Sequence, residues 1–464
     1  MLHQGRFDAA SAAFEEISRR SESDPTGPLF EALTTWWRLL DRPDDTGLHE
    51  TFEKRLDEAI RRGEALLATG EIQRGRIFAG TAYLLAAQAR AFSGSYLAAG
   101  RAARSGNALL EEAISADPEA ADVQFALGAY KYFAARLPWL VRFLRVFVRL
   151  PGGDVQEGLQ ALDQAAREGK YFRAESLLLL AYIHSGDDDT DLRAALDEVT
   201  RARALGSDSP LLATLQARFL LQLGRLAEAE STAHGALKLS GSLAGVAPSI
   251  PALARLIEAL SLYYQYQPEK ALEALGPLQS DPGDLPPDSR KRFDGLVARI
   301  RSDLDVSPPG AGNGSSDGRE TGDTDPPRHL AAAAPRPSGS RALEALGRLR
   351  DGQAKEAAGT LGALAAQDPN DVVLRYHAAR AYQIAGEPER ALVELHRLLE
   401  TEDRIPKTLR GWALLRMGAA LEACGRPEEA QEFYRRGARL KGFVFRSVGA
   451  DTLKHPESPY PPEG

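Results

Sequence analysis

Apolar and small residues at helical spacing fill most of the chain, and glycine and proline separate one stretch from the next. In the N-terminal half this pattern predicts helices over 72–92, 96–115, 119–135, 156–168 and 172–185. The second of these carries a seam of small residues that would let another helix approach closely. The seam consists of Ala98, Ala99, Ala102, Ala103 and Gly106. Because alanine, leucine, arginine and glutamate also dominate the composition, the sequence predicts an all-α fold.

A fixed interval recurs in the C-terminal third, where a glycine is followed five residues later by an alanine. The pairs are Gly352 with Ala357, Gly386 with Ala391, and Gly425 with Ala430. The first two pairs lie 34 residues apart and the third follows after 39. A glycine can end a helix at positive φ, and an alanine lets the next helix pack closely against the one before it. The interval therefore predicts repeated helix hairpins, and it occurs once more at Gly224 and Ala229.

Two of these units resemble the tetratricopeptide repeat. The matching residues are Ala379, Tyr382, Gly386 and Ala391 in one unit, and Gly418, Leu421, Gly425, Ala430 and Tyr434 in the next. Leu421 stands where the family has an aromatic residue. The resemblance implies an α-solenoid of antiparallel helix hairpins that winds into a right-handed superhelix.

A block over 121–158, together with Trp36 and Trp37, is similar to part of a largely uncharacterised group of bacterial tetratricopeptide proteins. It includes the stretch Leu150–Asp154 and Gly158. Many members of that group are exported. The similarity implies a fold for the first two hundred residues or so, and it implies no known reaction.

Proline, glycine and serine crowd the stretch 305–340, which has almost no large apolar residue. Such a segment cannot bury enough surface to offset the entropy of ordering it. We therefore expect a helical-repeat body over 1–304, a disordered linker over 305–340, a C-terminal repeat block over 341–442 and a loose tail over 443–464.

An apolar run over 137–150 is interrupted only by arginines and contains no acidic residue. In a helix the arginines would form one narrow stripe beside a broad aromatic and aliphatic face. The candidate residues are Trp139, Arg142, Phe143, Arg145, Phe147 and Arg149. Two interpretations stay open. The segment is either a helix packed under the solenoid, or a face that docks on a partner or a membrane surface.

The net charge of −8 argues against a nucleic-acid partner, which would favour a basic face. The single cysteine, Cys424, rules out an internal disulfide. The first six residues lack the apolar core of a secretory signal, so the sequence as written predicts a cytoplasmic protein. Gly5 and the residues after it have the pattern of the turn and second helix of a repeat, but the first helix of that repeat is missing. Either the first repeat is a capped half-unit, or the true start lies upstream with an export signal, which would make the protein periplasmic or envelope-associated.

Searches for catalytic and metal-binding patterns give no catalytic, cofactor or metal site. The string Gly314–Gly318 matches a nucleophile elbow but lies in the predicted linker, without a strand or helix beside it. An EF-hand spacing occurs where three aspartates alternate, but Leu192 stands where the loop requires glycine. Its candidate ligands are Asp187, Asp189, Asp191 and Glu198.

The repeat resemblance implies that positions 2, 5, 9 and 12 of each first helix line the concave surface. Tyrosine, tryptophan and arginine at such positions are the usual anchors of protein interfaces. The candidate partner-binding residues are Tyr376, Arg380, Gln383, Trp412 and Glu422. Trp412 is expected either in the core or in the groove. The subgroup that clamps a chaperone's terminal carboxylate is not expected, because the chain lacks its paired asparagines.

The function expected from the sequence is therefore a non-enzymatic scaffold that binds a protein or peptide. A peripheral membrane or envelope-associated adaptor that docks through 137–150 is the alternative.

Overall fold

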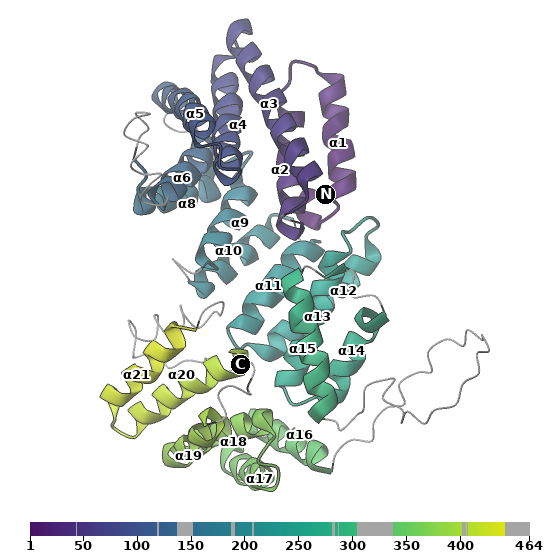
Figure 1. The fold of residues 1–464 in the computed structure, drawn as a ribbon, viewed down its shortest axis with the longest axis vertical. Helices are drawn as coiled ribbons and strands as arrows, with labels where there is room; N and C mark the ends of the chain where they lie inside the picture. Colours follow the sequence, from purple (N-terminus) through teal and green to yellow (C-terminus); the bar gives the residue numbers. More distant parts are fainter. Residues whose placement is uncertain are drawn as a thin grey trace, which may run out of the picture. The chain divides into compact units, whose positions relative to one another are not determined.

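The computed structural model describes residues 1–136, 152–303 and 337–440, apart from short gaps at 43, 118–119, 187–190, 207, 281–283, 286, 401–404 and 406. Within these ranges every regular element is a helix (Figure 1). The predicted all-α class of paired helices is thus confirmed for the described residues. The predicted tail and nearly all of the predicted linker fall outside them, as does segment 137–150.

The chain forms two compact units. The N-terminal unit comprises Met1–Gly186, Ala194–Ala213 and Lys238–Ile250, and the C-terminal unit comprises Asp187–Arg193, Thr214–Leu237 and Pro251–Gly464. The division runs through four helices that lie between residues 192 and 264.

In the N-terminal unit, successive helices pack antiparallel against each other from α1 to α5, and α6 packs on α8. The elements are η1 (Leu2–Gln4), α1 (Phe7–Arg20), α2 (Thr26–Asp41), α3 (Thr46–Thr69), α4 (Ile72–Phe92), α5 (Tyr96–Ala116), α6 (Ala121–Ala135), α8 (Val155–Glu168), α9 (Arg173–His184) and most of α10 (Leu192–Ala204). The five helices predicted from the N-terminal sequence all form, with ends that differ by two residues at most. The small-residue seam packs against α4, where a Cβ on Gly106 would lie 2.8 Å from the carbonyl oxygen of Gly80.

The C-terminal unit contains most of α11–α13 and all of α14–α21. Their bounds are α11 (Pro210–Gln222), α12 (Leu226–Ser242), α13 (Ser249–Tyr264), α14 (Pro268–Ser280), α15 (Pro287–Asp303), α16 (Pro337–Arg350), α17 (Ala354–Gln367), α18 (Val372–Ile384), α19 (Pro388–Leu399), α20 (Lys407–Ala423) and α21 (Pro427–Ala438). From α16 to α21 each helix packs on the next, and α18 also contacts α20.

The predicted turn glycines adopt the left-handed conformation. At Gly386 φ is +76°, and the following amide of Glu387 donates to the Tyr382 carbonyl at 2.8 Å, which closes the end of α18. The glycines of the other three intervals have φ between +73° and +81°. The paired alanines are fully buried; they are Ala229, Ala357, Ala391 and Ala430. The interval therefore marks the inter-helix turns, as the sequence predicted.

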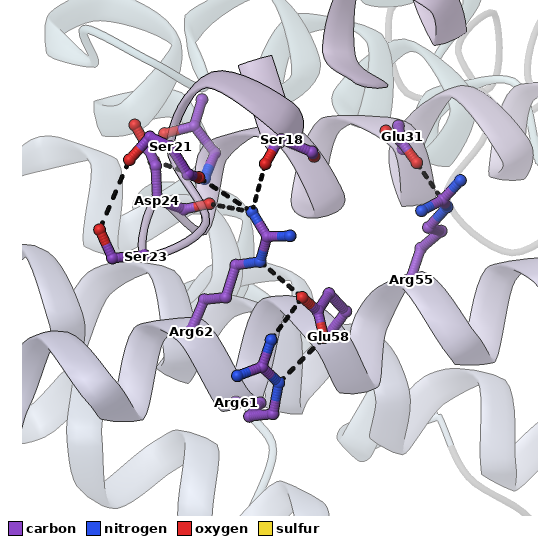
Figure 2. Close-up of polar contacts among 10 residues, drawn as sticks. Ser18, Ser21, Ser23, Asp24, Glu31, Arg55, Glu58, Arg61 and Arg62 are labelled. Carbon is purple, nitrogen blue, oxygen red and sulfur yellow. Dashed lines mark hydrogen bonds and ion pairs between the residues drawn. The ribbon is translucent and has the colours of Figure 1, made fainter. Parts of the chain in front are cut away.

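Arg62 on α3 ties down the C-terminal end of α1, where helix carbonyls have no partner within the helix (Figure 2). Its Nη1 donates to the carbonyl oxygens of Ser18 at 3.2 Å, Ser21 at 3.1 Å and Asp24 at 3.2 Å. Its Nε donates to Glu58 at 2.6 Å, and hydrogen bonds from Arg61 and Arg62 hold the pKa of that carboxyl below its usual range. One guanidinium thus joins α3 to the turn between α1 and α2.

Replacing Arg62 by methionine removes all three bonds to carbonyls while keeping much of the aliphatic stem. Because Arg62 is only 9% exposed, we expect the free energy of unfolding of the N-terminal unit to fall by about 1–3 kcal/mol. The matched control is Arg61→Met, because the Arg61 guanidinium is exposed and pairs with Glu58, so its loss should leave stability close to wild type. Urea midpoints followed by circular dichroism give the comparison. Equal midpoints for the two variants would contradict this role of Arg62.

Candidate functional site

The C-terminal unit contains a pocket of about 530 Å³, within the range of ligand-binding cavities. Four helices contribute its charged side chains and one histidine: Glu230 on α12, Lys270 on α14, His377 and Arg380 on α18, and Arg416 on α20. Aromatic and aliphatic side chains complete the wall; they are Tyr376, Trp412, Leu343 and Leu346. The pocket therefore combines apolar walls with a few polar groups, as binding sites usually do.

Three of the five candidate groove residues predicted from the sequence line this pocket, namely Tyr376, Arg380 and Trp412. Gln383 lies beside the lining and makes two hydrogen bonds of 2.9 Å with Arg416. Its Oε1 accepts from the Arg416 guanidinium, and its Nε2 donates to the Arg416 carbonyl. Glu422 is not among the lining residues and accepts a hydrogen bond from the Tyr434 hydroxyl at 3.0 Å. The candidates in segment 137–150 lie outside the described residues.

Trp412 belongs both to the core and to the pocket wall. It is 1% exposed, and its ring packs edge-on against Tyr264 with the centroids 5.0 Å apart. The Tyr376 ring also contacts it, with the centroids 6.1 Å apart. These rings fix the spacing of α18 and α20, so the pocket is built on packed helices rather than on loops.

Arg416 places a buried guanidinium at the pocket. It is 6% exposed, and its Nε donates to the Tyr376 hydroxyl at 2.9 Å. No carboxylate among the described residues pairs with it, although an isolated buried charge is costly. With Lys270 and Arg380 it gives the lining three cations, against one carboxylate on Glu230. The lining therefore contains more basic than acidic side chains.

His377 is 3% exposed, and its Nε2 donates to the Tyr264 carbonyl at 2.6 Å. Burial, together with the charges of Arg380 and Arg416, lowers the pKa of the imidazole to about 3, so the ring is neutral near pH 7. With the proton on Nε2, the lone pair of Nδ1 can only accept a hydrogen bond. Within the described part of the chain Nδ1 has no such partner.

One turn beside the pocket is held in a strained conformation. Tyr266, between α13 and α14, has φ +64° and is the only described non-glycine residue with positive φ. Its hydroxyl donates to Asp371 at 2.6 Å, and that carboxylate also accepts from the Leu374 amide to cap α18. The strained backbone at Tyr266 is therefore held by a hydrogen bond to the start of α18, the helix that carries His377.

Sequence reasoning missed His377, Arg416 and Lys270. The first two occupy position six of their repeats, next to the predicted position five, so they fall outside the positions that usually line the groove. The detectable signal is a polar residue at this buried position in two successive units. Lys270 comes from a helix outside the two units that resemble the repeat.

The other sequence candidates have structural surroundings. Of the EF-hand spacing, Asp187 and Asp189 lie outside the described residues, Asp191 accepts a hydrogen bond from the Arg193 amide, and Glu198 contacts His184 at 2.9 Å. The described ranges hold no cluster of side chains suited to a metal ion. None of the helices in those ranges is long and apolar enough to cross a membrane.

No protein-family model matches the sequence, and no curated protein matches it. Among solved structures, a tetratricopeptide repeat protein from Parabacteroides merdae is similar at 14% identity over 68% of this chain and 96% of that one, with a TM-score of 0.27. The TPR2AB domain of yeast Sti1 in its pHSP90 complex is similar at 11% identity over 62% and 98%, with a TM-score of 0.24. Human IFIT1 as a dimer with m7Gppp-AAAA is similar at 14% identity over 97% and 85%, with a TM-score of 0.29.

At these TM-scores the similarities carry no argument for this chain. The class of protein that the described helices define is an array of antiparallel helix hairpins. The fold assignment itself rests on the helices and turns described above. What the similar proteins bind carries no argument for this chain.

The neutral His377 gives a prediction for stability against pH. Its pKa is about 3 in the folded chain, against an ordinary value of 6.5, so below pH 6.5 the unfolded chain binds a proton that the folded chain does not. The C-terminal unit should therefore lose stability as the pH falls from 6.5 toward 3, by at most about 1.4 kcal/mol per pH unit from this one group. Carboxylates also take up protons in this pH range. The test is therefore the difference in denaturant midpoint between wild type and His377→Gln, measured at each pH. That difference should shrink as the pH falls, and parallel curves would contradict the buried neutral imidazole.

Proposed function

We propose that the protein is a non-enzymatic scaffold that holds a peptide or protein partner, and that the pocket beside α18 and α20 is where the partner binds. The observation that carries the proposal is the pocket itself, in which a buried arginine stands beside packed aromatic rings. Arg416 has no carboxylate partner within the described residues, while Trp412 and Tyr376 provide a rigid wall. Buried aromatic and arginine side chains at a groove are the usual anchors of protein recognition.

The proposal is tested by filling the pocket. Ala227 is exposed and lines the pocket from the first turn of α12, so Ala227→Trp should occupy its mouth without disturbing buried contacts. The matched control is Lys238→Trp, an exposed position on the same helix away from the lining. A synthetic library of twelve-residue peptides supplies the probe, and affinities of the selected peptides are measured by fluorescence anisotropy.

We expect Ala227→Trp to weaken peptide binding at least tenfold and Lys238→Trp to leave it unchanged. If no peptide binds, or if both variants bind as wild type does, the scaffold proposal for this pocket is wrong. The alternative of membrane docking through 137–150 rests on the sequence alone. Vesicle flotation of wild type against Trp139→Glu/Phe143→Glu tests it separately, since equal flotation would exclude that segment as the anchor.

A further inference from the structure

Three residues that lead from α8 into α9, Lys170–Phe172, lie against the inner layer of helices in the N-terminal unit. Within that layer α2 contacts α4, α4 contacts α6, and α6 contacts α9, as the first helices of successive hairpins do. Phe172 is fully buried, and its ring stacks on Phe125 of α6 with the centroids 5.0 Å apart and on Phe30 of α2 at 5.8 Å. One side chain therefore joins two hairpins that are not neighbours in the array.

Tyr171 extends this contact to the hairpin between those two. Its ring packs edge-on against Phe78 of α4 with the centroids 5.9 Å apart, and the Lys170 ammonium lies 5.3 Å from the Tyr171 centroid. Phe78 is buried, whereas Tyr171 is 44% exposed. The stretch thus crosses the first helices of three hairpins, which form the surface on which hairpin arrays bind their partners.

A single carboxylate holds the backbone of the stretch. Asp122 on α6 is 8% exposed and accepts hydrogen bonds from three successive backbone amides. The amides are those of Lys170 at 3.1 Å, Tyr171 at 2.7 Å and Phe172 at 2.9 Å. Because hydrogen bonds to a carboxylate are stronger than those between neutral groups, Asp122 fixes the path of the chain across the layer.

This arrangement is not the usual course of a connection between hairpins. The connection between α3 and α4, which also joins two hairpins, is exposed from Thr69 to Glu71. Between α8 and α9 the chain instead places a buried ring among the helices of other hairpins, with its amides on Asp122. Aromatic walls and one well-placed polar group on packed helices are what a peptide-binding site consists of. Here the chain itself supplies the occupant.

We propose that the inner face of the N-terminal unit is a second peptide-binding surface, which Lys170–Phe172 closes in cis. The external ligand is an extended segment with two successive aromatic residues, whose rings pack at Phe30 and Phe125 and whose backbone amides bind Asp122. The internal stretch is tethered at both ends, so its effective concentration exceeds that of any free peptide. An external segment therefore binds only when this stretch is withdrawn.

The test removes the internal rings from the full chain and supplies them in trans. Tyr171→Ala/Phe172→Ala leaves the surrounding wall in place, and the probe is a fluorescein-labelled, amidated peptide with the sequence of residues 168–174. By fluorescence anisotropy we expect this variant to bind the peptide at least tenfold more tightly than wild type does. Adding Asp122→Asn should abolish the gain. The matched control is Tyr182→Ala, an exposed tyrosine on α9, which should bind no better than wild type.

Three results of the peptide measurement would overturn the proposal. These are equal binding to wild type and to Tyr171→Ala/Phe172→Ala, a gain that persists with Asp122→Asn, and equal binding of a peptide whose two aromatic residues are alanine. The measurement does not involve the pocket of the C-terminal unit. Its failure would therefore leave the scaffold proposal standing, and a peptide library without a binder for that pocket would leave this inference standing.

If Tyr171→Ala/Phe172→Ala does not fold, hydrogen exchange of the wild-type chain decides the matter. We expect the three amides bound to Asp122 to exchange faster than the interior amides of α4 and α6, because the stretch opens while the helix layer stays folded. Exchange of all these amides at one common rate would show that the stretch belongs to the core and does not open, which would overturn the proposal.

Discussion

Gly158→Ala should be among the most destabilising single substitutions in the N-terminal unit. A Cβ at this position would lie 2.7 Å from the Tyr132 amide nitrogen and 2.9 Å from the Gly128 carbonyl oxygen. Both contacts are with backbone, so relief requires α6 and α8 to move apart along their whole interface. We expect the free energy of unfolding to fall by about 3 kcal/mol, at the upper end of overpacking effects.

The matched control for this prediction is Gly235→Ala, a helical glycine on α12 where an added Cβ would have no atom within 4 Å. There the added methyl meets open space, and the alanine should stabilise the helix by about 0.5–1 kcal/mol. The measurement is hydrogen exchange of the amides in α6 and α8, which reports on these two helices directly, alongside denaturant midpoints. If the amides of α6 and α8 exchange at the same rate in Gly158→Ala as in wild type, the two helices do not approach as closely at Gly158 as described.

Trp412→Ala is expected to have the largest effect in the C-terminal unit. The indole is 1% exposed and joins α20 to Tyr264 and Tyr376. Its removal leaves a cavity between packed helices and should cost about 3–5 kcal/mol. The same change widens the pocket, so peptide binding should be lost with it.

Trp412→Phe is the milder variant, because it keeps an aromatic ring at this position and leaves a smaller cavity than alanine does. Its loss of stability should be less than half that of the alanine variant, as read from thermal unfolding and urea midpoints. If Trp412→Ala lowers the free energy of unfolding by less than about 1 kcal/mol, the ring does not support the α18–α20 spacing as described.

The sequence was sufficient for features set by local chemistry. Steric limits require a glycine where φ is positive and an alanine where two helices pack closely, and these two positions are always five residues apart. The hairpins near Gly386 and Gly425 could therefore be predicted residue by residue. Helix ends in the N-terminal unit followed from the same turn residues. The turn at Tyr266 could not be found in this way, since a tyrosine takes the place of glycine there and is held by a contact with Asp371, far along the chain.

The candidate site shows a similar limit. Tyr376, Arg380 and Trp412 were found by repeat position, because the groove of a hairpin array is a periodic surface. His377 and Arg416 left one signal in the sequence, a polar residue at the same position of two successive units. Their burial and their hydrogen-bond partners depend on packing between helices and could not be predicted. Segment 137–150 lies outside the described residues, so its two interpretations stand as they did from the sequence.

The central claim is that a partner binds at the pocket beside α18 and α20. Photo-crosslinking tests it most directly, with a selected peptide that carries a diazirine and with mass spectrometry to map the adducts. The account predicts adducts within Val372–Ile384 and Lys407–Ala423 that disappear in Ala227→Trp. Adducts concentrated in the N-terminal unit or in 137–150, and unchanged in Ala227→Trp, would contradict it.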